Sequence, residues 1–426
     1  MQEMHDLQAA SPPHLRRNWR RIGQKPHGHS SHLNQNTEVA ASRFDRVMPS
    51  PSSPPSGPSP LFESLNASRV PGMDALRLFA VVAVMMGHAG LGGWGFGLQV
   101  LLVISGFLIT RMLLTEHAAT GSVNVPRFAW HRTARLLPLV VVYATMGAVY
   151  LMVRHKEVPW AAALAAVLQV HNYYQALTGA QTNYLSHVWS LSMQEQFYVL
   201  WPLLLVWAWR RGAKLEWLIL GYIAVCWGVR ACEFLVLHAS DEYLYRALET
   251  RSDNLAWGGL IAVLGREKRW TALYDRIGRA APLLLLTVCV CVGMLVDHPG
   301  DQSYKYLFRF AVEPMLIALA LPLFLMMASS GTWTRRALSA RWLVAAGQGT
   351  YGMYISHQIL MHGFLNTLLR REWPPLLAFV ASTLLVGIVG HLSFRHFETP
   401  VRRWLQSGKA RAALQQWLSS RHGSAA

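Results

Sequence analysis

The strongest constraint on this chain is a series of long apolar runs that hold few charged side chains. About 20 residues cross ~30 Å of hydrocarbon as a helix, and a helix satisfies its own backbone hydrogen bonds there. The sequence therefore predicts an all-α, polytopic membrane protein of about ten transmembrane helices, with no soluble catalytic domain. The runs lie near residues 75–92, 97–115, 136–154, 187–209, 214–238, 249–265, 280–297, 308–328, 342–362 and 376–396.

The composition and the basic residues indicate how these runs cross the membrane. Only 14% of the residues are charged, yet the formal net charge is +17. Because basic loops tend to stay cytoplasmic, ten spans with both termini in the cytoplasm place five basic clusters inside; Arg370 and Arg371 are the exception. No RNA- or DNA-binding motif accompanies the charge, so no nucleic-acid partner is expected. The clusters are Arg127/Arg132/Arg135, Arg210/Arg211/Lys214, Arg266/Lys268/Arg269, Arg335/Arg336/Arg341 and Arg402/Arg403.

Three parts of the chain are distinguished by composition. Residues 1–66 are first basic and then Pro/Ser-rich, which predicts a disordered cytoplasmic tail. The membrane domain is expected over 67–404, and 405–426 form a short basic cytoplasmic tail. The weakly apolar segment 160–176 would move the later basic clusters outside if it spanned, so 155–186 are predicted to be an external loop. The four cysteines lie in apolar runs and are interpreted as buried small side chains, not as metal ligands.

Two ionisable residues stand inside the first run, where such groups are costly unless paired or facing a polar cavity. Arg77 and His88 are eleven residues apart, about 20° from three full helical turns and ~16 Å along the axis. They therefore share one helix face, with Arg77 near the cytoplasmic end and His88 near the outer side. A snorkelling arginine with a structural histidine is one interpretation, and a functional pair is the other.

Other polar residues cluster at the ends of later runs. Arg132 and Arg135 are one turn apart before the third run, either as membrane anchors or as a clamp for phosphate oxygens. The fourth run opens with HVWSLSMQEQFYVLWP, and its His187, Ser190 and Glu195 are difficult to explain by packing alone. The sixth and ninth runs add further candidates, for which a local ion pair and a structural histidine are the simpler explanations: Arg251, Asp253 and His357.

Seven sequence elements follow one another along residues 70–400. They are GMDALRLFAVVAVMMGH, GLQVLLVISGFLIT, HRTARLLP, HVWSLSMQEQFYVLWP, TRSDNLAWGGLIA, TYGMYISH and FETP. In these elements and their order the chain resembles the acyltransferase 3 family, whose members move acyl groups, usually acetyl, from coenzyme A to sugar and related hydroxyls. The resemblance implies a multi-pass O-acetyltransferase of the bacterial inner membrane, with acetyl-CoA as donor, an envelope glycan or glycolipid as acceptor, and no metal.

The resemblance also implies roles for individual residues. The family's Arg-x10-His pair, which is important for catalysis, falls on Arg77 and His88, with His88 as general base or as transient acyl carrier. The family glutamate of the WSLxxE element falls on Gln194, so Glu195 is the expected acid, although one step along a helix turns a side chain by about 100°.

Two further sets of residues complete the expected site. Donor binding is expected at Arg132 and Arg135, which match the family's cytoplasmic basic motif. Residues near the outer mouth are expected to orient the acceptor: His187, Ser190, Arg251, Asp253 and His357.

Two other classes of function also fit intramembrane Arg, His and Glu. A membrane carrier typically has two related halves with discontinuous helices, and no internal repeat is found here. A non-catalytic scaffold of the same fold is the second alternative, and Gln194 in place of the family glutamate is its main support. No residue identifies the acceptor, the acyl length, the protein partners or the oligomeric state.

Overall fold

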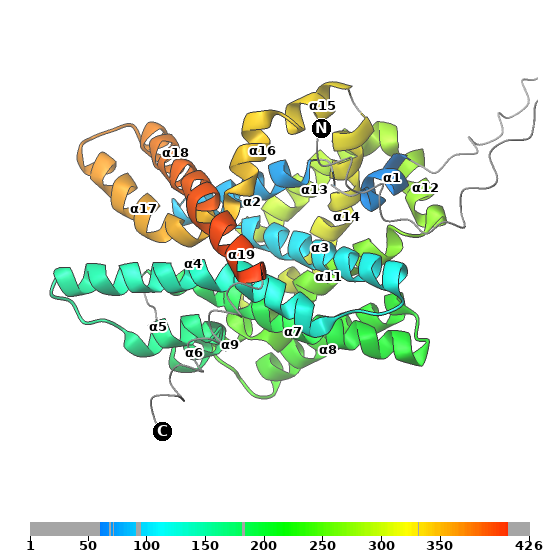
Figure 1. Cartoon of the computed structure of the whole chain (residues 1–426), viewed down its shortest axis with the longest axis horizontal. Coiled ribbons are helices and arrows are strands. Elements are labelled where there is room, and N and C mark those ends of the chain that lie inside the picture. Colours follow the sequence, from blue (N-terminus) through cyan, green and yellow to red (C-terminus); the bar gives the residue numbers. More distant parts are fainter. Residues whose placement is uncertain are drawn as a thin grey trace, which may run out of the picture. The chain divides into compact units, whose positions relative to one another are not determined.

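The computed structural model describes residues 60–67, 70, 72–90, 95–180, 184–330 and 332–407 of the 426-residue chain. Every regular element among them is a helix, which confirms the predicted all-α class (Figure 1). Within this part, six helices are long and apolar enough to cross a membrane, and the number of ten stays a prediction. They are Gly97–Thr120, Val125–Val153, Leu215–Leu235, Gly278–Asp297, Tyr304–Ser329 and Pro375–Gln406.

Each predicted apolar run lies on at least one helix. The helices that carry these runs are α2 (Met73–His88), α3 (Gly97–Thr120), α4 (Val125–Val153), α7 (Trp189–Arg211), α8 (Leu215–Leu235), α10 (Leu248–Arg251), α11 (Asp253–Leu264), α13 (Ala281–Asp297), α14 (Phe310–Ser330), α16 (Arg341–Gln348), α17 (Thr350–Arg370) and α18 (Pro375–Ser393). Between them lie the shorter α1 (Pro60–Asn66), α5 (Trp160–Val167), α6 (His171–Thr178), α9 (Asp241–Arg246), α12 (Lys268–Arg276), α15 (Thr332–Leu338) and α19 (Thr399–Gln406).

Helices α3 and α11 pack with their backbones in direct contact. A Cβ added to Gly106 of α3 would lie 1.8 Å from the carbonyl oxygen of Leu255, and one added to Gly258 of α11 would lie 1.9 Å from that of Val103. Such distances exclude any side chain, so the two glycines are what allows this approach, as small residues do between membrane helices. The contact fixes α3 in the interior, where it supports the site described below.

Two sequence predictions differ from the structure, those for the end of the first tail and for the cysteines. The predicted unfolded tail extends too far, because Pro60–Asn66 form α1, whose Leu61 and Leu65 are buried in the core; residues 1–59 lie outside the described part. The region 160–176 contains α5 and α6, each eight residues long and too short to span. The prediction of four buried cysteines is wrong for three of them, since Cys226 alone is buried.

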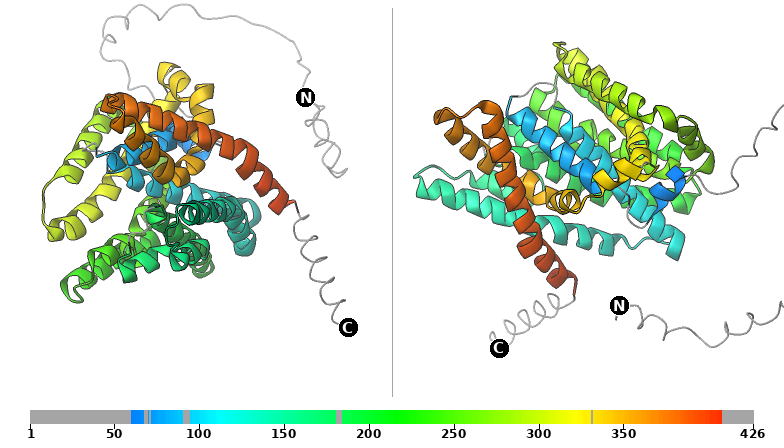
Figure 2. Two further views of the ribbon diagram at one scale, coloured as in Figure 1. Left: turned by 90° about the vertical axis from the view of Figure 1, so that its left-hand side faces the viewer. Right: turned by 90° about the horizontal axis from the view of Figure 1, so that it is seen from above.

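The C-terminal helices α17 and α18 form a helical hairpin, and α18 runs on into α19. Helices α17 and α18 lie side by side, and α18 continues through a π-helical turn at Phe394–Glu398 into α19 (Figures 1 and 2). A π-helical turn inserts an extra residue into the helix. Glu398, which ends this turn, is buried and accepts a hydrogen bond from Ser393 at 3.0 Å. Residues 408–426, where most of the predicted C-terminal tail falls, lie outside the described part.

Candidate active site

A polar cavity of about 710 Å³ is lined mainly by α2, α3, α4, α7 and α17. Four arginines line it, Arg77, Arg111, Arg132 and Arg135, against one acidic side chain, Glu116. The four arginines come from three helices: Arg77 from α2, Arg111 from α3, and Arg132 and Arg135, one turn apart, from α4. The cavity therefore has an excess of positive charge, which suits an anionic ligand with several phosphates.

One face of α3 lines the cavity along most of the helix. Leu101 is the first of these residues along α3 and Ala119 the last, 18 residues later. This separation corresponds to ~27 Å at 1.5 Å per residue, and the Leu101 end is called the inner end below. At the Leu101 end the walls are completed by Val81 of α2, Leu191 of α7 and Tyr354 of α17. The cavity is thus long and narrow, with apolar and tyrosine side chains where it ends.

Two of the four guanidinium groups in the cavity, those of Arg77 and Arg132, contact neighbouring side chains. Nη1 of Arg77 lies 3.5 Å from Oδ1 of Asp74, one turn earlier on α2. The Arg132 guanidinium lies over the rings of Phe128 and Tyr198, 5.9 and 5.4 Å from their centroids. Such cation–π contacts orient an arginine without neutralising it, so Arg132 keeps its charge for a ligand.

The structure separates the two neighbours on α7 that sequence comparison left ambiguous. Gln194 lines the cavity, and its Oε1 accepts hydrogen bonds from Tyr198 at 3.1 Å and Ser105 at 3.5 Å. Glu195 does not line the cavity; it is buried, and the charges of Arg132 and Arg135 act on it. The predicted acid therefore acts on the site through groups that line the cavity, and its role as an acid remains a prediction.

Three histidines from distant parts of the chain lie together beyond the inner end of the cavity. The rings of His88 and His357 are 5.2 Å apart between centroids, and those of His187 and His357 are 4.9 Å apart. His187 and His357 are buried, whereas His88 ends α2 and is exposed. In the described part of the chain, no three His, Cys, Asp or Glu residues are placed to hold a metal ion.

Tyr354 connects this histidine cluster with the cavity. It lines the cavity, and its ring centroid lies 5.6 Å from that of His187 and 5.5 Å from that of His357. Its hydroxyl is 2.6 Å from the Ser190 hydroxyl, which donates to the carbonyl oxygen of His187 at 3.0 Å. Three predicted residues, His187, Ser190 and His357, are thus gathered around Tyr354, and His88 contacts His357.

A backbone carbonyl group of α17 sets the tautomer of the His187 imidazole. Its Nε2 lies 2.9 Å from the backbone carbonyl oxygen of Ile355, so Nε2 carries the proton and donates. Nδ1 is buried and has no hydrogen-bond partner among the described residues. His187 therefore anchors the start of α7 to α17 through one specific ring nitrogen.

This geometry predicts different effects for two substitutions of similar size. His187→Gln places an amide N–H near the position of Nε2 and is expected to keep the bond to Ile355, whereas His187→Asn is too short to reach it. Loss of a buried hydrogen bond costs about 1–3 kcal/mol, so the Asn variant should be less stable than the Gln variant by about that amount. Thermal unfolding of both variants in detergent measures the difference, and equal melting temperatures would contradict the assigned tautomer.

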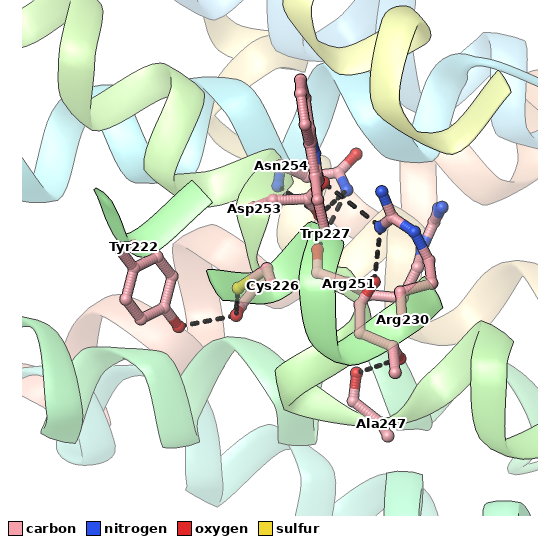
Figure 3. Close-up of polar contacts among 10 residues, drawn as sticks. Tyr222, Cys226, Trp227, Arg230, Ala247, Arg251, Asp253 and Asn254 are labelled. Atoms are coloured by element: carbon pink, nitrogen blue, oxygen red, sulfur yellow. Dashed lines mark hydrogen bonds and ion pairs between the residues drawn. The ribbon is translucent and has the colours of Figure 1, made fainter. Parts of the chain in front are cut away.

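Arg251 and Asp253, which were expected to orient the acceptor near the outer mouth, do not lie at the polar cavity. Both side chains are fully buried, and neither lines the polar cavity. Asp253 pairs with Arg230 of α8 at 3.2 Å and accepts from Trp227 at 2.9 Å (Figure 3). The local Arg251–Asp253 pair is not formed, because Arg251 instead lies over the Phe310 ring at 3.7 Å. We therefore leave both residues out of the acceptor site.

Sequence reasoning missed two charged residues of this interior. Arg111 lines the cavity from α3, and Arg230 is 1% exposed and neutralises Asp253. Both stand inside predicted spans, so the rule that an intramembrane charge needs a partner or a polar cavity would have found them. It would not have named their partners.

Comparison with known proteins shows the family to which this domain belongs. A family model described as an acyltransferase domain matches residues 70–392. The chain belongs to the acyltransferase 3 family. The matched region contains every residue of the histidine cluster and all four cavity arginines. It is therefore the domain that the sequence elements indicated.

Two relatives show how far this family likeness extends. The O-acetyltransferase OatA of Staphylococcus aureus is 25% identical over 361 residues, which cover 78% of this chain and 57% of the relative. The peptidoglycan O-acetyltransferase OatA of Listeria monocytogenes is 26% identical over 353 residues, which cover 78% and 56%. The chain thus spans little more than half the length of these relatives. No solved structure matches it.

Proposed function

We propose that this protein is an integral-membrane O-acetyltransferase that moves an acetyl group from acetyl-CoA to a hydroxyl of an envelope glycan or glycolipid. The observation that carries the proposal is the pair of residues that α2 places, one in the polar cavity and one at the histidine cluster. This one helix places Arg77 in an arginine-lined cavity and ends at His88, beside the buried histidine cluster. A non-catalytic scaffold does not require this combination of a basic cavity and histidines, and a carrier is expected to have two related halves, for which the sequence shows no internal repeat.

The donor would be held by its phosphates. Arg132 and Arg135 offer forked N–H donors that match phosphate oxygens in geometry and charge. Arg111, whose Nε donates to the carbonyl oxygen of Leu65 at 2.8 Å, adds positive charge to the same cavity. The long cavity along α3 suits an extended pantetheine arm, with the thioester toward the Leu101 end. The basic clusters favour placing the Ala119 end at the cytoplasmic side of the bacterial inner membrane, with both termini in the cytoplasm.

The acceptor would meet the thioester beside His88. As a general base, His88 removes the proton from the acceptor hydroxyl, whose oxygen attacks the thioester carbonyl carbon. The carbon–sulfur bond breaks, and the thiolate takes the proton from His88 to give free CoA. If His88 instead carries the acetyl group, its ring nitrogen attacks first and the hydroxyl second. His187, Ser190 and His357 support this end of the site through Tyr354, and Glu195 acts on Arg132.

The names of the relatives supply the first acceptor to test. One of them is a peptidoglycan O-acetyltransferase, so cell-wall glycan is the preferred class, with lipid-linked glycan as the next. Membranes containing the protein, incubated with radiolabelled acetyl-CoA, are expected to transfer label to extracted glycan or glycolipid. Label in neither fraction, with CoA thioester left intact, would contradict an acetyltransferase and favour a scaffold. Solute flux without transfer would favour a carrier.

The donor contacts predict a specific kinetic change. Arg132→Gln and Arg135→Gln are each expected to raise KM for acetyl-CoA by about tenfold to a hundredfold, the worth of one charged hydrogen bond. Arg127→Gln is the matched control, because Arg127 is exposed on the same helix and does not line the cavity. Initial rates over a range of acetyl-CoA concentrations give the values. Equal effects at all three positions would show that only general positive charge matters.

A further inference from the structure

A second cavity lies on the other side of α3. It has a volume of about 420 Å³ and is lined almost entirely by apolar side chains of α2, α3, α13 and α14. Phe79, Met86, Val288, Ile317 and Phe324 are among them. Unlike the polar cavity, it has no charged residue in its walls, so an alkyl chain is the ligand that it suits.

Ile104 separates the two cavities. Among the described residues it alone lines both of them, and its side chain is 2% exposed. The positions on α3 explain this, since at 100° per residue Val100 lies about 40° to one side of Ile104 and Leu108 about 40° to the other. Val100 lines only the apolar cavity and Leu108 only the polar one. Ile104 therefore points between the two faces of the helix.

The position of Ile104 along the cavity relates this wall to the reaction. Ile104 lies one turn from Leu101, at the inner end where Tyr354 leads to the histidine cluster. In the proposed function, which this inference takes as its basis, the thioester and its acyl group lie at this end. The acyl group is then confined on one side by Ile104, with apolar space directly behind it.

We propose that Ile104 determines the acyl length of the donor by closing the polar cavity off from the apolar one. A β-branched side chain is stiff at χ1 and forms a firm wall. An acetyl group fits in front of this wall, and a longer chain does not. Without the wall, each added methylene enters apolar space and strengthens binding by about fourfold.

The test uses Ile104→Ala with acetyl-, butyryl- and hexanoyl-CoA as donors, and measures kcat/KM for each. The ratio of hexanoyl to acetyl transfer is expected to rise by about tenfold or more over wild type, within the usual range for a change in pocket size. Ile104→Val removes one methyl group, keeps the fold, and is expected to give a smaller rise for butyryl-CoA. Detergent chromatography confirms that each variant is folded.

A matched substitution separates the wall from cavity size. Ile317→Ala removes the same atoms from the apolar cavity only. It is not expected to change the hexanoyl-to-acetyl ratio. An unchanged ratio in Ile104→Ala and Ile104→Val, or an equal rise in Ile317→Ala, would overturn the proposal. Wild-type transfer of acetyl tests the proposed function separately, because it does not depend on Ile104.

Discussion

Replacing His88 with alanine is expected to lower acetyl transfer to the acceptor by about 10²- to 10⁴-fold, the usual contribution of a general acid–base group. His88 is the one exposed member of the histidine cluster, and it ends the helix that carries Arg77 into the polar cavity. Rates with radiolabelled acetyl-CoA, in membranes adjusted to equal protein content, measure the loss.

A histidine outside the site provides the control for this experiment. His298 is exposed at the end of α13 and lines neither the polar nor the apolar cavity, so His298→Ala is expected to keep wild-type activity. Transfer by His88→Ala within threefold of wild type would show that His88 is structural. Label that stays on wild-type protein but is absent from His88→Ala would identify the acyl-carrier mechanism.

Replacing Asp253 with alanine is expected to lower the stability of the protein by about 3–5 kcal/mol, as expected when one partner of a buried ion pair is removed. The substitution leaves Arg230 charged and only 1% exposed, and it also removes the acceptor for the Trp227 indole N–H. The remaining partner of Arg230 is the carbonyl oxygen of Thr250, at 2.6 Å. Thermal unfolding in detergent measures the change.

The double variant Asp253→Ala/Arg230→Met distinguishes loss of the pair from loss of packing. Removing both charges replaces the ion pair by apolar groups, which is often close to neutral in stability. The double variant should therefore unfold at a higher temperature than Asp253→Ala alone. A double variant that is no better than the single one would show that Asp253 stabilises the fold through its other hydrogen bonds.

The sequence named most residues of the candidate site because its elements are local. The spacing of Arg77 and His88 on one helix, and of Arg132 and Arg135 on another, follows from the 3.6-residue period and holds in the structure. His187, Ser190 and His357, which were expected to orient the acceptor, lie together around Tyr354. These residues stand on apolar helices, where a polar side chain needs a partner or a polar cavity.

The errors arose where a partner lies far away in the sequence. Arg251 and Asp253 are two residues apart, which suggested a local pair, but Asp253 pairs with Arg230, 23 residues earlier. Gln194 and Glu195 are adjacent, and only the packing of α7 against α3 and α4 shows that the amide, not the carboxylate, lines the cavity. Side-chain direction around a helix depends on its neighbours, which periodicity does not specify.

By itself, the sequence indicated the membrane class, the helical content and most of the candidate arginines and histidines, because hydrophobic length and helical spacing are local properties of the chain. The tertiary structure alone decided which charges pair, which residue of α7 reaches the cavity, and that Ile104 stands between two cavities. These features depend on contacts between helices distant in sequence. The close packing of α3 against α11, which Gly106 and Gly258 allow, is one such contact.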